Sequence, residues 1–159
     1  MEHFSDINKM YKKLNVRADM IYEFVILYHN YIYAQHTYEA ENCNMMEIHT
    51  LTYIDDSPGI TATELSKIWH KSKSAISQTI KKLINSGYVE KKYLENNEKT
   101  ARLFTTEKGH QLSNVHKAYD VADITQTTAY LVEQCSEEDL DAFYRILEQY
   151  IGLLKSEIQ

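Results

Sequence analysis

The 159-residue sequence is poor in proline, glycine and cysteine, with one, four and two residues of these types. Scarce backbone breakers together with 43% apolar residues favour a mainly helical protein of one-domain length. Cys43 and Cys135 do not form a Cys-x-x-Cys pair, so a disulfide is not predicted and a reducing compartment is expected. The first residues lack a basic segment followed by an apolar one, which argues against a signal peptide.

Long apolar runs and catalytic motifs are missing as well. No run of 18 apolar residues occurs, so we expect no membrane span and a cytoplasmic protein. There is no Gly-rich phosphate loop, Gly-x-Ser-x-Gly or His-Glu-x-x-His sequence. Cysteine and histidine are present, but nothing in the sequence places them together as nucleophile and base. The sequence therefore predicts a protein that is not an enzyme.

The most informative stretch lies between residues 72 and 87. Ser72 is suited to cap the start of a helix, and Gly87 is suited to end it in a left-handed conformation. Between them, apolar residues recur at spacings that place them on a single helical stripe. The opposite face holds Ser74, Ser77, Gln78, Lys81 and Asn85. This face contains no acid, as expected of a surface that lies against phosphates and base edges.

The neighbouring segments extend this helix into a larger module. Residues 61–69 predict a short preceding helix, in which Thr61 and Glu64 form a capping box. Residues 88–94 and 99–105 are rich in β-branched and aromatic residues and flank a polar turn, which predicts a β-hairpin. Two helices joined by a tight turn and followed by a hairpin predict a winged helix-turn-helix.

Positive charge is concentrated in the same module. Residues 61–104 hold nine Lys/Arg and four Asp/Glu, a net charge of +5, whereas the whole chain has a net charge of −6. An acidic protein with one basic module has the charge distribution expected of a polyanion-binding surface. The alternative is a winged helix that contacts only other proteins.

Four motifs follow one another along this module. They are Thr-Glu-Leu-Ser at 63–66, the polar helix at 72–87, Gly-Tyr-Val-Glu-Lys-Lys at 87–92 and Thr-Thr-Glu-Lys-Gly at 105–109. In this order they resemble the winged helix-turn-helix of the MarR family of bacterial transcription regulators, most strongly over residues 45–120. The resemblance implies a two-fold dimer of helical chains whose wing tips enter the minor groove.

Two positions depart from the family pattern. The wing, where the family usually has Asp-x-Arg, reads Asn97-Glu98-Lys99, and lysine is more strongly hydrated than arginine and lacks its planar fork. His70 stands at a turn position often held by glycine, so a positive φ there would be mildly strained.

The predicted fold is mainly α with a small β-hairpin wing, in a single MarR-type domain over residues 1–159. Residues 45–105 would form the winged helix-turn-helix, and residues 1–44 and 106–159 the helices of a homodimer. A final helix opened by Ser136 has apolar residues at spacings of three and four. This spacing places them along one face of the helix, an apolar seam that can pack against another helix. The seam residues are Leu140, Phe143, Leu147, Ile151 and Leu154. We also predict helices over residues 4–14, 17–40, about 44–55 and 107–133.

The resemblance implies that the polar helix enters a major groove of double-stranded DNA, with half-sites of a pseudo-palindrome about one helical turn apart. The predicted DNA-binding residues are Ser72, Lys73, Ser74, Ser77, Gln78, Lys81, Lys82, Lys99 and Arg102. Ser74, Ser77 and Gln78 would read base edges, and the lysines and the arginine would meet phosphates. The predicted function is a ligand-responsive repressor, with a metal-responsive regulator as the alternative.

His49 and His116 are candidate effector residues, with Asp120 one helical turn beyond His116. They resemble two zinc ligands of the family's zinc-responsive repressors, whose remaining His and Glu correspond here to Asp120 and Tyr31. Zinc accepts a carboxylate, but a phenol rarely ligates it. The segment 47–54 with His116 equally resembles the family's fatty-acid-synthesis repressors, which respond to acylated carrier protein without a metal. The third alternative is a structural hydrogen bond between two packed helices.

Aromatic residues crowd the predicted helix over residues 17–40. They are Tyr22, Tyr28, Tyr31, Tyr33 and Tyr38, with His29 and His36 among them. Either these rings pack as amphipathic core, or they line an aromatic ligand cavity against the DNA-binding module.

Overall fold

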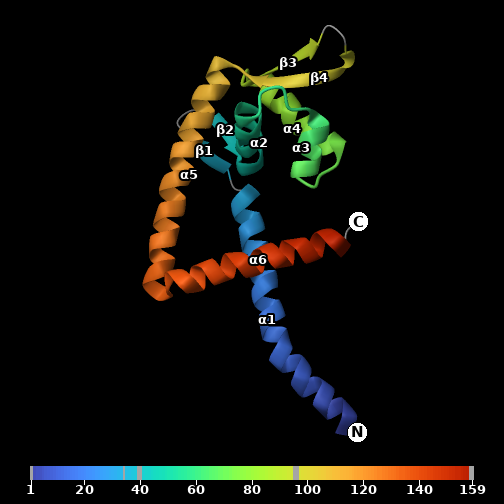
Figure 1. Ribbon diagram of the computed structural model, residues 1–159, viewed down its shortest axis with the longest axis vertical. Coiled ribbons are helices and arrows are strands. Elements are labelled where there is room, and N and C mark those ends of the chain that lie inside the picture. Colours follow the sequence, from blue (N-terminus) through green and yellow to red (C-terminus); the bar gives the residue numbers. More distant parts are fainter. Residues whose placement is uncertain (1, 34, 39–40, 95–96, 158–159) are drawn as a thin grey trace. The chain divides into compact units, whose positions relative to one another are not determined.

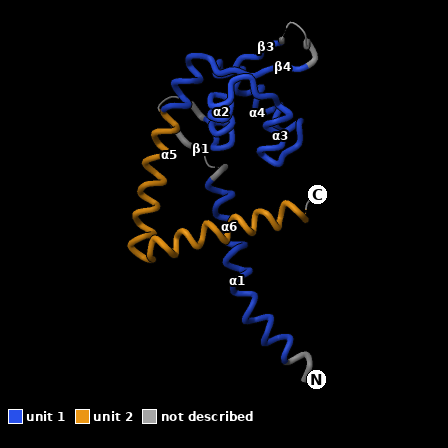
Figure 2. The backbone as a smooth tube through the Cα atoms, viewed as in Figure 1, with its two compact units in different colours: residues 1–114 blue, residues 115–159 orange. Residues whose placement is uncertain are grey.

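The computed structural model describes residues 2–33, 35–38, 41–94 and 97–157, with the side chains of 2–5, 32–42 and 94–99 outside the description (Figure 1). The elements are α1 (Glu2–Tyr33), β1 (Gln35–Tyr38), β2 (Glu41–Asn44), α2 (Met45–Asp56), α3 (Ala62–Ile68), α4 (Lys73–Asn85), β3 (Val89–Leu94), β4 (Asn97–Thr105), α5 (Glu107–Gln134) and α6 (Glu137–Glu157). Residues 1–114 and 115–159 form two compact units, and the boundary between them falls inside α5 (Figure 2).

Side-chain caps start the three helices of the winged module. The Asn44 side chain accepts from the Glu47 N–H at 2.9 Å, while the Glu47 carboxylate accepts from the Asn44 N–H, as a capping box. Thr61 and Glu64 make the same arrangement at α3. Hydrogen bonds from the Thr61 hydroxyl and N–H hold the pKa of the exposed Glu64 carboxyl below its usual range. Ser72 caps α4, where its hydroxyl accepts a first-turn N–H at 3.3 Å.

The helices and the wing of this module share one core. The apolar stripe predicted for α4 is buried, with Ile76, Ile80 and Leu83 at most 2% exposed. Other members of the core are Ile48, Leu51, Ile54, Leu65, Tyr88, Val89 and Leu103. Each fully buried Leu or Ile side chain contributes about 1.5–3 kcal/mol relative to an exposed one. This packing fixes α4 with its opposite, polar face turned outward.

Two residues with positive φ shape the turns around α4. His70, between α3 and α4, has φ 48°, as the comparison with the family's turn glycine anticipated. A left-handed non-glycine residue costs roughly 1–2 kcal/mol. Gly87 has φ 76° and ends α4 as predicted, before β3 and β4 pair antiparallel from Val89 opposite Thr105. The wing is longer than predicted, because β4 begins at Asn97.

The predicted break between helices 4–14 and 17–40 is wrong. The first helix, α1, continues without interruption from Glu2 to Tyr33. No proline or glycine stands near residues 15 and 16, so nothing local stops the helix there.

The predicted extent of the second helix to residue 40 is also wrong. Beyond α1, strands β1 and β2 pair antiparallel, with Gln35 opposite Asn44. β-Branched and aromatic residues such as Thr37 and Tyr38 suit an extended hairpin, and the helical spacing of the tyrosines concealed this change. The side chains of Tyr33, His36 and Tyr38 lie outside the description, so the prediction for these rings remains untested.

The second unit contains the remainder of α5 and all of α6. Ser136 opens α6 as predicted, and it forms a capping box with Asp139. The Ser136 N–H donates to the Asp139 carboxylate at 3.2 Å, and the Asp139 N–H donates to the Ser136 hydroxyl at 3.1 Å. No residue of α6 is buried, and Phe143, Ile151 and Leu154 of the predicted seam are 44–49% exposed. Among the described residues, no helix is long and apolar enough to cross a membrane.

Candidate nucleic-acid interface

The outward face of α4 is the one that the sequence singled out. Its exposed side chains are Lys73, Ser74, Ser77, Gln78, Lys81, Lys82 and Asn85. Ser72 serves mainly as the cap of α4, although its hydroxyl also lies 3.0 Å from that of Ser74. A hollow beside this face has a lining of mixed polarity from α3, α4 and the wing, with Thr61, Ser77 and Lys91 among its polar residues. Hydroxyl and ammonium donors on one exposed helix suit contacts with nucleic acid.

The basic residues of the wing differ from one another in their contacts. Arg102 is half-buried, and its guanidinium donates to the Gly59 carbonyl at 3.0 Å, which ties the wing to the loop before α3. Lys92 forms an ion pair with Glu90 at 2.6 Å and lies over the Phe104 ring. The backbone of Lys99 belongs to β4, but its side chain lies outside the description. The phosphate contacts predicted for Arg102 and Lys99 stay predictions.

One lysine of α4 is already paired within the module. The ammonium of Lys82 lies 2.7 Å from the Glu47 carboxylate of α2. The sequence alone does not reveal this partner, because the two residues are 35 positions apart.

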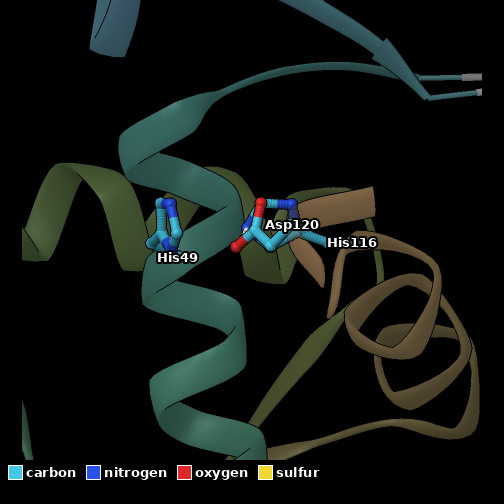
Figure 3. A group of neighbouring side chains, drawn as sticks. All are labelled: His49, His116 and Asp120. Atoms are coloured by element: carbon cyan, nitrogen blue, oxygen red, sulfur yellow. Dashed lines mark ion pairs between the residues drawn. The ribbon is translucent and has the colours of Figure 1, made fainter. Parts of the chain in front are cut away.

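The candidate effector residues lie on α2 and α5. His116 is fully buried, and its Nε2 lies 3.3 Å from the carboxylate of Asp120, one turn along α5. Figure 3 shows these side chains, with His49 on α2 and with His116 and Asp120 on α5. Two imidazoles and a carboxylate are a donor set that zinc accepts when a further position is left for water or a ligand. By their chemistry His49, His116 and Asp120 therefore suit zinc, whereas the phenol of Tyr31 is a group that rarely ligates it.

A mainly apolar cavity lies beside the turn of the helix-turn-helix, between α1 and α2. It has a volume of about 290 Å³ and is lined by Phe24, Val25, Tyr28, His29, Met46, Trp69 and Lys71. The Nε1 of Trp69 is buried and has no hydrogen-bond partner among the described residues. The sequence indicated only the tyrosine and histidine wall of this cavity. A buried donor without a partner costs about 1–3 kcal/mol.

Comparison with known sequences places the winged module in a family. Residues 44–102 match the sequence profile of the MarR family. YhjH of Bacillus subtilis (strain 168), an uncharacterized HTH-type transcriptional regulator, is 29% identical over 75 residues, which are 47% of this chain. The match covers only 43% of the length of that protein.

Solved structures show the same fold over most of the chain. FabT of Streptococcus pneumoniae in complex with DNA has a TM-score of 0.68 and 20% identity, covering 92% of this chain and 98% of that chain. The zinc-responsive ZitR of Lactococcus lactis has a TM-score of 0.64 and 16% identity, covering 91% and 98%. A putative MarR family regulator of Listeria monocytogenes complexed with 26mer DNA has a TM-score of 0.59 and 20% identity, covering 97% and 89%. Residues 44–102 of this chain therefore match the MarR family, and most of the chain shares the fold of solved MarR-type regulators.

Proposed function

We propose that the chain is a sequence-specific DNA-binding transcriptional regulator that acts as a homodimeric repressor on a pseudo-palindromic operator. The observation that supports this most strongly is the exposed, acid-free face of α4, within a module of net charge +5 in an acidic chain. Relatives of the same fold have been solved in complexes with DNA, which is consistent with this proposal. Catalysis plays no part in it.

In the proposed complex, α4 lies in the major groove. Ser74, Ser77 and Gln78 would read base edges, while Lys73 and Lys81 would meet phosphates. The winged module comprises residues 45–105 of a single MarR-type domain. With two copies, the half-sites would lie about one helical turn apart.

The dimer is proposed from the unpartnered apolar side chains of the terminal helices. Residues 1–44 and 106–159 would provide its helices. Along α1, large apolar residues such as Met10, Leu14 and Met20 are 57–65% exposed, and the seam of α6 is also uncovered. Exposed apolar surface on this scale marks an interaction site, and a second copy of the chain would bury it.

Gln78→Ala tests the proposed reading of base edges by α4. It should weaken binding to the selected operator by about 1–3 kcal/mol, the usual size of a good base contact, and leave random duplex nearly unaffected. Lys81→Ala should weaken both duplexes alike and reduce the slope of log K against log salt by about one. Fluorescence anisotropy at several salt concentrations measures both effects.

Equal losses of affinity for operator and random DNA in Gln78→Ala would reject Gln78 as a base reader. A chain that binds no duplex at all would instead be a protein-contact module.

We further propose that a ligand regulates DNA binding. The apolar cavity beside Trp69 supports an organic ligand with one acceptor, such as an acyl chain, because its walls are mainly hydrophobic and the indole donor has no partner among the described residues. The alternative is zinc at His49, His116 and Asp120, which the donor set supports.

Titration of operator affinity separates these effectors. Zinc and long-chain acyl carrier protein should be added separately to the wild type, to Trp69→Phe and to a His49→Ala/His116→Ala variant. An organic effector should change wild-type affinity at least fivefold, the lower end of typical coupling, and should lose this effect in Trp69→Phe. A zinc effect should disappear only in the histidine variant. Changes below about twofold with both ligands would reject regulation by either and favour a structural role for the histidines.

A further inference from the structure

Glu47 is a nearly buried carboxylate with two separate partners. One oxygen accepts from the backbone N–H of Asn44 at 3.2 Å and completes the cap of α2. The other accepts from the ammonium of Lys82 at 2.7 Å. The Glu47 side chain is only 10% exposed, whereas that of Lys82 is 67% exposed. A rigid, capped carboxylate therefore holds a lysine on the last turn of the predicted recognition helix.

The position of Lys82 on α4 differs from that of its neighbour Lys81. At roughly 100° per residue, Lys81 falls near the middle of the polar face, and Lys82 lies about 80° from Ser74, toward α2. Both lysines are exposed, so exposure alone does not tell them apart. The Glu47 contact distinguishes them, because it pairs the Lys82 ammonium with a carboxylate of the same module.

We infer that Glu47 is a positioning residue that fixes α4 against α2 and withholds Lys82 from the DNA phosphates. This inference rests on the proposed binding of DNA by α4. Each phosphate that a lysine neutralises strengthens binding to every duplex, whatever its sequence. Pairing Lys82 internally thus limits non-specific affinity while leaving Ser74, Ser77 and Gln78 in place. Glu47 would therefore lower the affinity for every duplex alike, and discrimination between sequences would be left to the side chains that read bases.

Matched lysine variants test the withheld charge. Lys81→Met should lower the slope of log K against log salt by about one on random duplex, since it removes a phosphate contact. Lys82→Met should leave that slope unchanged, although both variants remove one exposed charge from adjacent positions. If Lys82→Met lowers the slope as much as Lys81→Met does, Lys82 meets a phosphate and the inference is wrong.

Glu47→Gln tests the same contact from the other side. Glutamine also serves at this capping-box position, so α2 should remain folded, which circular dichroism would check. The freed Lys82 should steepen the salt dependence by about one and raise affinity for random duplex about fivefold near 0.15 M salt. Adding Lys82→Met to Glu47→Gln should restore the wild-type slope. An unchanged slope in folded Glu47→Gln would overturn the inference.

These results also distinguish the inference from the proposed function. If Lys81→Met and Gln78→Ala both leave duplex binding unchanged, α4 is not the DNA-binding element, and the inference is rejected with it. If those two variants behave as expected and Lys82→Met matches Lys81→Met, only the inference about Glu47 is rejected.

Discussion

Gly109→Ala should destabilise the protein by about 2 kcal/mol, even though this change usually stabilises a helix by about 1 kcal/mol. Gly109 lies in the first turn of α5, where an added Cβ would overlap the backbone carbonyl of Tyr88. That carbonyl accepts from the Thr106 N–H at 2.9 Å, and the Gly109 N–H donates to the Thr106 hydroxyl at 3.1 Å. Because backbone atoms at this junction are held from both sides, the overlap cannot be relieved by a side-chain movement.

Gly152→Ala is the matched control for this prediction. Gly152 lies in α6, and nothing stands within 4 Å of a Cβ built there. At roughly 100° per residue it lies about 140° from Leu147, away from the predicted seam. Gly152→Ala should therefore stabilise the protein by about 1 kcal/mol. Urea unfolding of both variants measures the two effects, and stabilisation by Gly109→Ala would contradict the described junction between the wing and α5.

Leu147→Asp should abolish the dimer and, with it, operator binding. Leu147 lies in the middle of the apolar seam of α6, whose members are incompletely covered within one chain. If a second copy covers the seam, aspartate would leave a buried carboxylate without a partner, at a cost of about 3–5 kcal/mol. Sedimentation should show a monomer or an aggregate in place of a dimer.

Gln149→Asp provides the control, because it adds the same charge at an exposed position on the other side of α6. It should remain dimeric and should bind the operator. A soluble Leu147→Asp dimer that still binds DNA would exclude the α6 seam from the interface between chains.

Local chemistry made the winged module predictable from the sequence. Asn44, Thr61 and Ser72 cap their helices with side chains that reach only three residues ahead, so the relevant partners are adjacent in the sequence. The burial of Ile76, Ile80 and Leu83 follows from their helical spacing. The left-handed turn at Gly87 follows from the conformational freedom of glycine. The left-handed turn at His70 follows from the family pattern, which often has glycine at this position.

Contacts between distant segments could not be predicted in this way. The Lys82–Glu47 pair joins residues 35 positions apart, and the 2.8 Å contact between His110 and Asp55 joins residues 55 positions apart. Neither contact leaves a periodic pattern in the sequence, because each depends on how whole helices pack against one another. The strand β1 was missed for a related reason, since tyrosine spacing can be helical in a segment that pairs as a hairpin.

Selection of binding sites from a pool of random duplexes tests the central claim most directly. The purified wild-type chain should enrich a pseudo-palindrome whose half-sites lie about one helical turn apart, and its affinity should fall steeply with rising salt. In the Gln78→Ala variant, enrichment should weaken at specific base pairs within each half-site. Failure of the wild-type chain to retain any duplex at low salt would contradict the proposal that the exposed face of α4 binds DNA.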